Sequence, residues 1–248
     1  MMGASMSLTR LETRLFLREP MSLIFGLLFP PLLLLAMGFL FPGFDEPLSD
    51  LDGERLIAVY APTIIGLALA TLSLMTLPMT LSSYREMGIL RRLRTTPIHP
   101  SRLLLAQVSA NAIVAVVGSS ITVFIAKLAF DVALPASPVW FGLSFLLGLI
   151  AMFTLGLLIG ALARSTTVGQ VLGFSLFFPM LFFAGVYVPR PFMSDGLSTI
   201  SNLTPLGAAV QAMSDSWAGN VPSGQHLLVM AAYTLVFGFL AVRLFRWE

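Results

Sequence analysis

This chain of 248 residues is 57% hydrophobic and 10% charged, whereas about a quarter of the residues in a typical soluble domain carry charge, so water is not its main solvent. It contains no cysteine, which excludes disulfide bonds and thiolate metal sites. The net charge of +2 comes with basic residues gathered at the ends of apolar runs, a pattern typical of membrane topology signals and not of nucleic-acid binding.

The N-terminal residues predict an amphipathic helix lying on the membrane surface over 5–19. Leucines recur there at intervals of three to four residues, whereas Arg10, Arg14 and Arg18 follow one another four residues apart. A positively charged juxtamembrane anchor and a specific docking segment both explain this pattern.

Apolar runs that are long enough to cross a membrane follow along the chain. They cover residues 21–41, 56–83, 103–130, 139–163, 168–188 and 225–245. Pro30 and Pro31 lie within the first run and predict a kink there. The sequence therefore predicts an all-α integral membrane protein with six transmembrane helices in one domain over 1–248.

Two pairs of residues predict contacts within this bundle. Lys127 and Asp131 are four positions apart near the end of the third run, which favours a structural ion pair at the membrane rim over a substrate-binding charge. Gly156 and Gly160 form a GxxxG pattern in the fourth run, which predicts close packing against a neighbouring helix.

The segment between the fifth and sixth runs has a different character. It contains two amphipathic pieces, at about 192–203 and 206–217, separated by Thr204 and Pro205. Both are too short to cross a membrane, so we expect re-entrant or interfacial half-helices on the outer surface.

The distribution of basic residues predicts the orientation. With both termini in the cytoplasm, the cytoplasmic side receives all of the 14 Lys and Arg residues except Arg55, Lys127 and Arg190. The opposite orientation would invert that excess, so we expect both termini inside the cell.

Several kinds of catalytic and transport chemistry have no residues to support them. The one lysine, Lys127, is not in a Walker A loop, and no HExxH motif is present. His99 lies in the stretch between the second and third runs and His226 at the outer boundary of the last run, whereas an intramembrane hydrolase needs a serine and a histidine facing each other within the bilayer. Acidic residues lie in loops or at helix ends, which makes a carboxylate relay poorly supported.

The stretch YREMGILRRLRTTPIHPSR, residues 84–102, is rich in arginine and joins the second and third runs. From Ser83 to Thr96 it predicts a short amphipathic helix with apolar residues three positions apart on one side. Pro97 ends this helix, because the residue before a proline is pushed out of the helical region. A helix held between two long transmembrane helices can transmit a force applied to it to both of them.

The chain here resembles the permeases of ABC type-2 transporters, and most closely their bacterial drug, lipid or polysaccharide export branch. The likeness lies in REMGILRRLRTTPIHPSRLLLAQ after the second run, and in FFPMLFFAGVYVPRPFM followed by Thr204 to Leu206 in the second half. It implies an integral protein of the bacterial plasma membrane that dimerises, as a homodimer or heterodimer. It also implies a separate ATPase subunit that binds ATP and Mg²⁺, so that this chain has no cofactor and no catalytic role.

The resemblance also implies residue roles. Contacts with the ATPase would come from the cytoplasmic helix and the N-terminal segment, through Arg85, Glu86, Met87, Gly88, Leu90, Arg91, Arg92, Arg94, Arg10 and Arg14. The outer half-helices, flanked by Pro189 and Pro205, would close the exit.

The residues themselves suggest a path for a hydrophobic or amphipathic cargo. Its candidates are Thr76, Asn111, Phe178 and Phe182. Hydrogen bonding between helices or to the helix backbone is the favoured explanation of Thr76 and Asn111, whereas contact with lipid explains Phe178 and Phe182 equally well. An ion-gradient-driven secondary transporter, an intramembrane enzyme and a membrane anchor are the alternative functions, and nucleic acid is not an expected partner.

Overall fold

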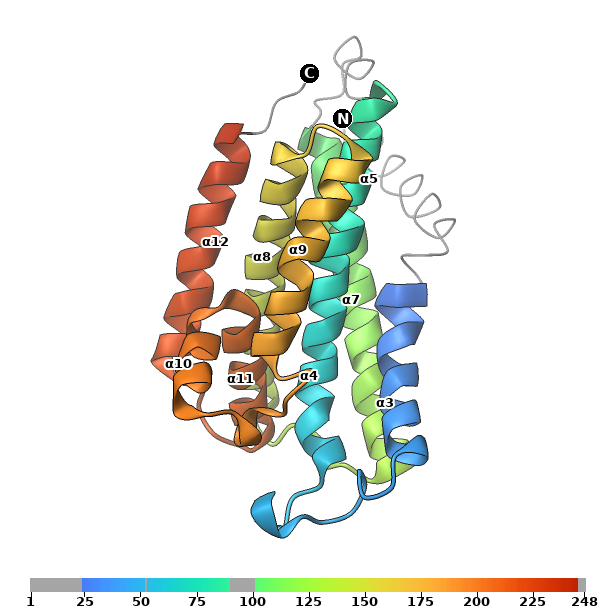
Figure 1. The fold of residues 1–248 in the computed structure, drawn as a ribbon, viewed down its shortest axis with the longest axis vertical. Coiled ribbons are helices and arrows are strands. Elements are labelled where there is room, and N and C mark those ends of the chain that lie inside the picture. The colour runs from blue at the N-terminus through green and yellow to red at the C-terminus, as the bar shows by residue number, and fades with distance from the viewer. Residues whose placement is uncertain (1–23, 52, 90–100, 245–248) are drawn as a thin grey trace.

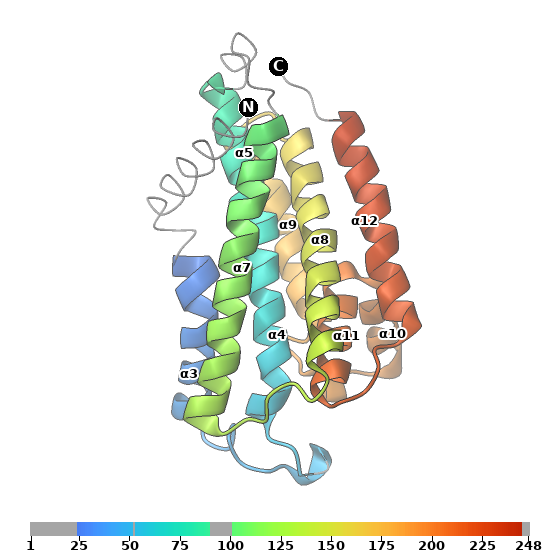
Figure 2. The ribbon, with the colours of Figure 1, turned by 180° about the vertical axis from the view of Figure 1, so that it is seen from behind.

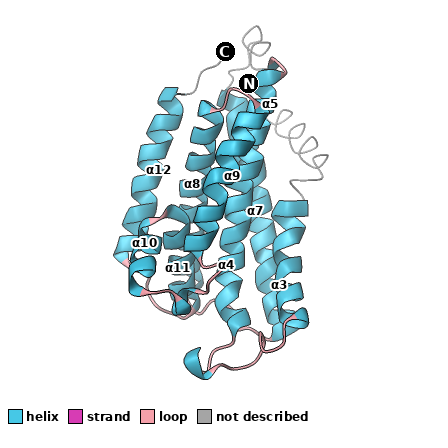
Figure 3. Cartoon of the chain, in the orientation of Figure 1, coloured by secondary structure: helices cyan, strands magenta, loops and turns pink. Residues whose placement is uncertain are grey.

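A computed structural model of the chain describes residues 24–51, 53–89 and 101–244. Within these ranges the regular elements are helices, which stand side by side in an elongated bundle (Figures 1, 2 and 3). The prediction of an all-α protein is confirmed for this part of the chain.

Five helices of the described residues are long and apolar enough to cross a membrane. They are the continuous helix Leu56–Glu86, α7 (Ser101–Phe130), α8 (Pro138–Leu162), α9 (Thr166–Ala184) and α12 (Gly224–Leu244). Each corresponds to one of the predicted runs after the first. α9 ends before the predicted limit at residue 188, because Gly185 has a φ of +93°, a left-handed conformation that ends helices.

The first predicted run is described only from Ile24 onward. A π-helical turn, η1 (Ile24–Leu28), precedes α3 (Phe29–Leu40). Pro30 and Pro31 lie near the start of α3, which continues directly from η1, and a proline has no amide hydrogen to donate to the preceding turn. A π-helical turn thus directly precedes the prolines, and the kink that the sequence predicts at them stays a prediction. The predicted surface helix over 5–19 lies outside the described residues.

The helix Leu56–Glu86 forms the centre of the bundle. It consists of α4 (Leu56–Ala70), the π-helical turn η3 (Thr71–Thr76) and α5 (Leu77–Glu86). Of its most apolar stretch of 18 residues, 83% is buried in the bundle. The corresponding shares are 28% for α9 and 11% for α12. The apolar faces of α9 and α12 are therefore open to lipid or to a partner chain.

Two glycines allow α8 and α9 to approach the backbone of η3. A Cβ atom on Gly156 of α8 would lie 2.1 Å from the carbonyl oxygen of Ser73, and one on Gly173 of α9 would lie 2.1 Å from that of Leu74. Gly160 of α8 packs against a side chain of the central helix, that of Leu81. The close packing predicted from the GxxxG pattern is confirmed.

Short helices close one end of the bundle, which we call the α11 end; the opposite end, where α5 finishes, is the α5 end. η4 (Arg190–Phe192), α10 (Asp195–Leu203) and α11 (Pro205–Trp217) follow α9. α11 packs against α4, α8, α9 and α12 (Figures 1 and 2). α10 and α11 occupy the two segments for which the sequence predicts short helices, although Phe192 belongs to η4.

The predicted pair at the end of α7 is present. Lys127 Nζ lies 2.5 Å from Asp131 Oδ1, and Arg55 donates a hydrogen bond of 3.2 Å to the carbonyl oxygen of Asp131. The hydrogen bond and the charge of Lys127 lower the pKa of the Asp131 carboxyl. Both side chains of the pair are exposed, so the ion pair contributes little to stability, and its structural role at the membrane rim stays a prediction.

Candidate functional site

The predicted cytoplasmic helix from Ser83 to Thr96 is interrupted. α5 ends at Glu86, and Gly88 has a φ of +67°, which breaks the helical path. The prediction of one continuous helix is therefore wrong at this point, because a left-handed glycine follows the last turn. The coupling candidates Leu90, Arg91, Arg92, Arg94, Arg10 and Arg14 lie outside the described residues.

Glu86 makes a two-pronged contact with the start of α9. Its Oε1 accepts a hydrogen bond of 3.0 Å from the Thr166 amide, and its Oε2 accepts one of 2.9 Å from the Thr166 hydroxyl. Thr166 is the first residue of α9, whose unpaired amides and dipole favour a carboxylate there. Ser165 caps the same helix by accepting from the Val168 amide at 3.2 Å.

Arg85 contacts the other side of the same turn. Its guanidinium donates to the carbonyl oxygen of Ala163, the residue that follows α8. Arg85 therefore bonds to the beginning of the α8–α9 turn, and Glu86 bonds to its end. We call these contacts the α5 staple. A displacement of the end of α5 must move this turn or break the staple.

The staple gives Arg85 and Glu86 partners within the chain, whereas the sequence suggested partners in an ATPase. Met87 and Gly88, which follow, differ from them. The Met87 side chain is 55% exposed, and a Cβ atom on Gly88 would meet nothing within 4 Å. Contact between these residues and an ATPase stays a prediction.

The four path candidates do not share one surface. Asn111 is fully buried in α7, and its Nδ2 donates a hydrogen bond of 2.9 Å to the carbonyl oxygen of Gln107 in the same helix. Thr76 is partly buried at the end of η3. Phe178 is 52% exposed on α9, and Phe182 lies one turn later and is partly buried. Of the four, Phe178 is the one that is largely exposed on the outside of a single chain.

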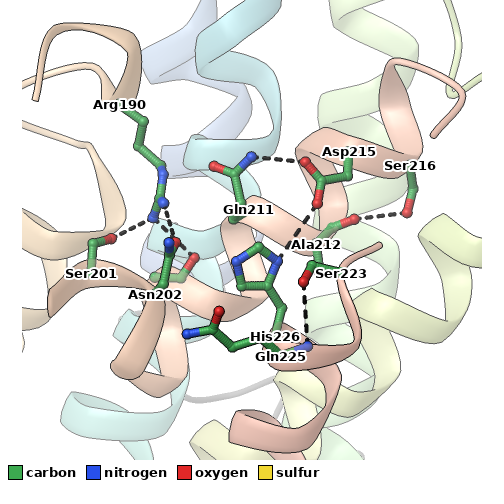
Figure 4. A network of polar contacts seen from close by, with 11 residues as sticks. Arg190, Ser201, Asn202, Gln211, Ala212, Asp215, Ser216, Ser223, Gln225 and His226 are labelled. Carbon is green, nitrogen blue, oxygen red and sulfur yellow. Dashed lines mark hydrogen bonds and ion pairs between the residues drawn. The ribbon is translucent and has the colours of Figure 1, made fainter. Parts of the chain in front are cut away.

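At the α11 end, Arg190 joins three helices. Its guanidinium donates to Ser201 Oγ and Asn202 Oδ1 of α10 and, at 3.3 Å, to the carbonyl oxygen of Gly207 in α11 (Figure 4). Burial lowers the pKa of this guanidinium, whereas the charge of Asp215 raises it.

The two predicted gate residues flank this junction. Pro189 directly precedes η4, and Pro205 is buried in the first turn of α11. Arg190 therefore connects the segments that the two prolines begin. Their role as a gate stays a prediction.

A second set of polar contacts connects α11 to α12. Asp215 Oδ1 accepts a hydrogen bond of 2.8 Å from Gln211 Nε2, and His226 Nδ1 lies 3.6 Å from Asp215 Oδ2 (Figure 4). Burial alone would raise the pKa of Asp215, but the contacts with His226 and Gln211 outweigh it and lower the pKa. At 3.6 Å the imidazole contact is longer than a hydrogen bond.

A cavity of about 950 Å³ lies beside these polar contacts. The start of α4, the loop after α7, α10, α11 and the start of α12 form its walls. Sequence analysis missed it because its residues come from separate segments and share no motif. Two residues could have pointed to it from the sequence. Arg190 is one of the few basic residues on the predicted outer side, and His226 lies at the edge of a predicted span.

Two comparisons with known proteins bear on this arrangement. The family model described as "ABC-2 type transporter" matches residues 4–217, which is most of the chain. The chain is also 25% identical, over 173 residues, to the Bacillus subtilis (strain 168) protein named "Putative transport permease YvfS". That alignment covers 68% of this chain and 69% of the relative.

Proposed function

Because this chain belongs to the ABC-2 type transporter family, and is therefore a membrane subunit of an ABC transporter, we propose that it forms half of the translocation path of an ATP-driven exporter. Two copies, or this chain and a related one, would enclose the path. A separate ATPase subunit would bind ATP and Mg²⁺. The proposed cargo is hydrophobic or amphipathic, such as a drug, a lipid or a lipid-linked glycan.

The proposed topology has six spans in the plasma membrane with both termini in the cytoplasm. The five long helices support it, as does the shorter apolar helix Gly26–Leu40. Arg164 and Arg243 lie at the α5 end, whereas Asp45 and Glu46 lie in the loop at the α11 end. The α5 end is then cytoplasmic, with the 5–19 helix on its membrane surface, and α10 and α11 form the outer half-helices.

The poorly buried helices support a dimer. α9 carries exposed aromatic side chains, and Phe174 and Phe178 stack with ring centroids 6.2 Å apart. A path between two copies would be lined by such residues and not by Asn111, which is buried within one chain. An apolar lining suits a cargo with a large apolar part.

The observation that carries the mechanism is the α5 staple. In the proposed cycle, closure of the ATPase dimer pushes the residues after Gly88. The push reaches the end of α5, and Arg85 and Glu86 pass it to the α8–α9 turn. α9 then moves, and with it the face that would border the path.

We expect replacement of Glu86 with alanine to uncouple ATP hydrolysis from movement of α9, because the turn loses two of its hydrogen bonds to α5. The chain has no cysteine, so the single variant Val171→Cys places a spin label on the exposed face of α9. In the complex with its ATPase, the label-to-label distance should change between the ADP and ATP states. Glu86→Ala should remove that change while leaving ATPase activity within about twofold.

Glu46→Ala is the matched control, since Glu46 is an exposed loop carboxylate at the opposite end. It should leave both the distance change and the ATPase activity intact. An undiminished distance change in the triple variant Glu86→Ala, Arg91→Ala, Arg92→Ala would contradict the proposed coupling. Transport by the purified chain alone, driven by an ion gradient without nucleotide, would favour the secondary-transporter alternative.

A further inference from the structure

The cavity at the α11 end has the size of a small-molecule site. Its volume of about 950 Å³ falls within the usual range for ligand pockets, and exposed residues such as Glu54 and Asn220 lie on its wall. Among the helices that form its wall, α10 and α11 lie toward the opposite end of the bundle from the end of α5 (Figure 1). The proposed coupling mechanism therefore does not use it.

Most charged side chains on its wall already have partners in the protein. Arg55 pairs with Asp45 at 2.8 Å, and Asp131 pairs with Lys127. Charged groups that are held in this way have little capacity left for a ligand charge.

The same holds for the two charged groups of Figure 4. Arg190 donates to neutral acceptors on α10 and α11, and Asp215 accepts from Gln211 and faces His226. A ligand that drew either charge toward itself would have to break these contacts. The donor and acceptor atoms of Arg190 and Asp215 are thus largely occupied within the protein.

The groups that remain available are mostly neutral donors and acceptors. Among the described residues, the hydroxyls of Ser198 and Ser214, the amide nitrogen of Asn202 and the amide oxygen of Gln211 line the cavity without a hydrogen-bonding partner. The carboxylate of Glu54 is the charged exception and is exposed. Such a set both donates and accepts, and its members come from different walls of the cavity.

We propose that this cavity binds a neutral, polyhydroxylated ligand such as a sugar ring. Each hydroxyl of a sugar donates one hydrogen bond and accepts others, which matches the mixture of free amide and hydroxyl groups. The charged side chains nearby polarise these amide and hydroxyl groups. Because those side chains already have partners in the protein, they do not require a charge on the ligand. The volume accommodates one or two rings. This site stands apart from the proposed transport path, and binding to it requires neither ATP nor an ATPase.

The test measures binding of maltose to the full chain by calorimetry and by saturation-transfer NMR. The chain is held in lipid nanodiscs without glycoside detergents, which would compete. Glucose, glucose 6-phosphate and glucosamine serve as neutral, anionic and cationic versions of one ring. Maltose and glucose should bind, and the two charged analogues should bind about tenfold more weakly, because the other charged groups on the wall already have partners and the Glu54 carboxylate is exposed to water, where an ion pair adds little.

Two variants locate the site. Gln211→Ala removes a free amide oxygen, and Ser214→Ala removes a free hydroxyl with little effect on packing. Each should weaken maltose binding about tenfold, the effect of one or two lost hydrogen bonds. Gln225→Ala is the matched control, because Gln225 is exposed in the first turn of α12 and does not line the cavity.

Loss of binding in Gln211→Ala and Ser214→Ala, with normal binding in Gln225→Ala, would support the proposal. Absence of maltose and glucose binding, tighter binding of a charged analogue, or unchanged binding in Ser214→Ala would overturn it. None of these results depends on ATP-driven transport, so failure of this proposal leaves the exporter proposal standing, and the reverse also holds.

Discussion

Gly156→Ala should lower the stability of the folded chain by about 3 kcal/mol, and Gly156→Leu should prevent folding, because α8 has no space for a side chain here. A Cβ atom would lie 2.1 Å from the carbonyl oxygen of Ser73 and 2.9 Å from its carbonyl carbon. Both are backbone atoms of η3, in the buried centre of the bundle, and they cannot swing aside as a flexible side chain can. The measurement is the thermal unfolding midpoint in detergent, together with the yield of monodisperse protein.

Gly142→Ala is the matched control, because it makes the same chemical change in the same helix. A Cβ atom on Gly142 would meet nothing within 4 Å. We expect this variant to be neutral or more stable by up to about 1 kcal/mol, the difference in helix propensity between the two residues. If Gly156→Ala unfolded at the same temperature as Gly142→Ala, α8 would not contact η3 as closely as described.

Arg190→Met should destabilise the α11 end by about 3 kcal/mol. Methionine has a similar length and fills the space, but it leaves Asn202 Oδ1 without its donor and removes the additional contact with the carbonyl oxygen of Gly207. The hydroxyl of Ser201 keeps its bond to the carbonyl oxygen of Phe183. We expect α10 and α11 to loosen before the long helices do. Hydrogen exchange over residues 195–217, together with the thermal midpoint, measures this.

Arg55→Met is the comparison for Arg190→Met, since Arg55 is also an arginine at the α11 end. Its salt bridge with Asp45 is partly exposed, so the variant should cost less than about 1 kcal/mol. Arg190→Lys should recover only part of the lost stability, because Nη1 contacts Ser201 and Gly207 whereas Nη2 contacts Asn202, and one ammonium replaces both nitrogens. Equal destabilisation by Arg190→Met and Arg55→Met would contradict the role given to Arg190.

The local errors of the sequence analysis have a common physical origin. Gly88 and Gly185 both adopt positive φ values and end or interrupt helices that the apolar pattern extends further. A glycine inside an apolar or amphipathic stretch is compatible with either outcome, because periodicity records which residues face a core and not the backbone angle of one residue. Gly156, by contrast, stays helical and serves close packing.

The candidate site was accessible from sequence only in part. Arg85 and Glu86 attracted attention because they lie in a basic stretch between two spans. Their partners, Ala163 and Thr166, are about 80 residues further on, and no local pattern links them. Nothing in the sequence singles out Asp215, because one carboxylate in a short amphipathic helix is expected to be exposed. Only the fold places Gln211 and His226 beside it.

The sequence by itself determined that the chain is an all-α membrane protein, where its long helices lie, and which family it resembles. Apolar runs of membrane length and the placement of basic residues carry that information, because insertion depends on composition along the chain. The tertiary structure decided the α5 staple, the contact of Gly156 and Gly173 with η3, and the cavity at the α11 end. These features depend on helix rotation and on contacts between distant segments, which packing sets and linear composition does not record.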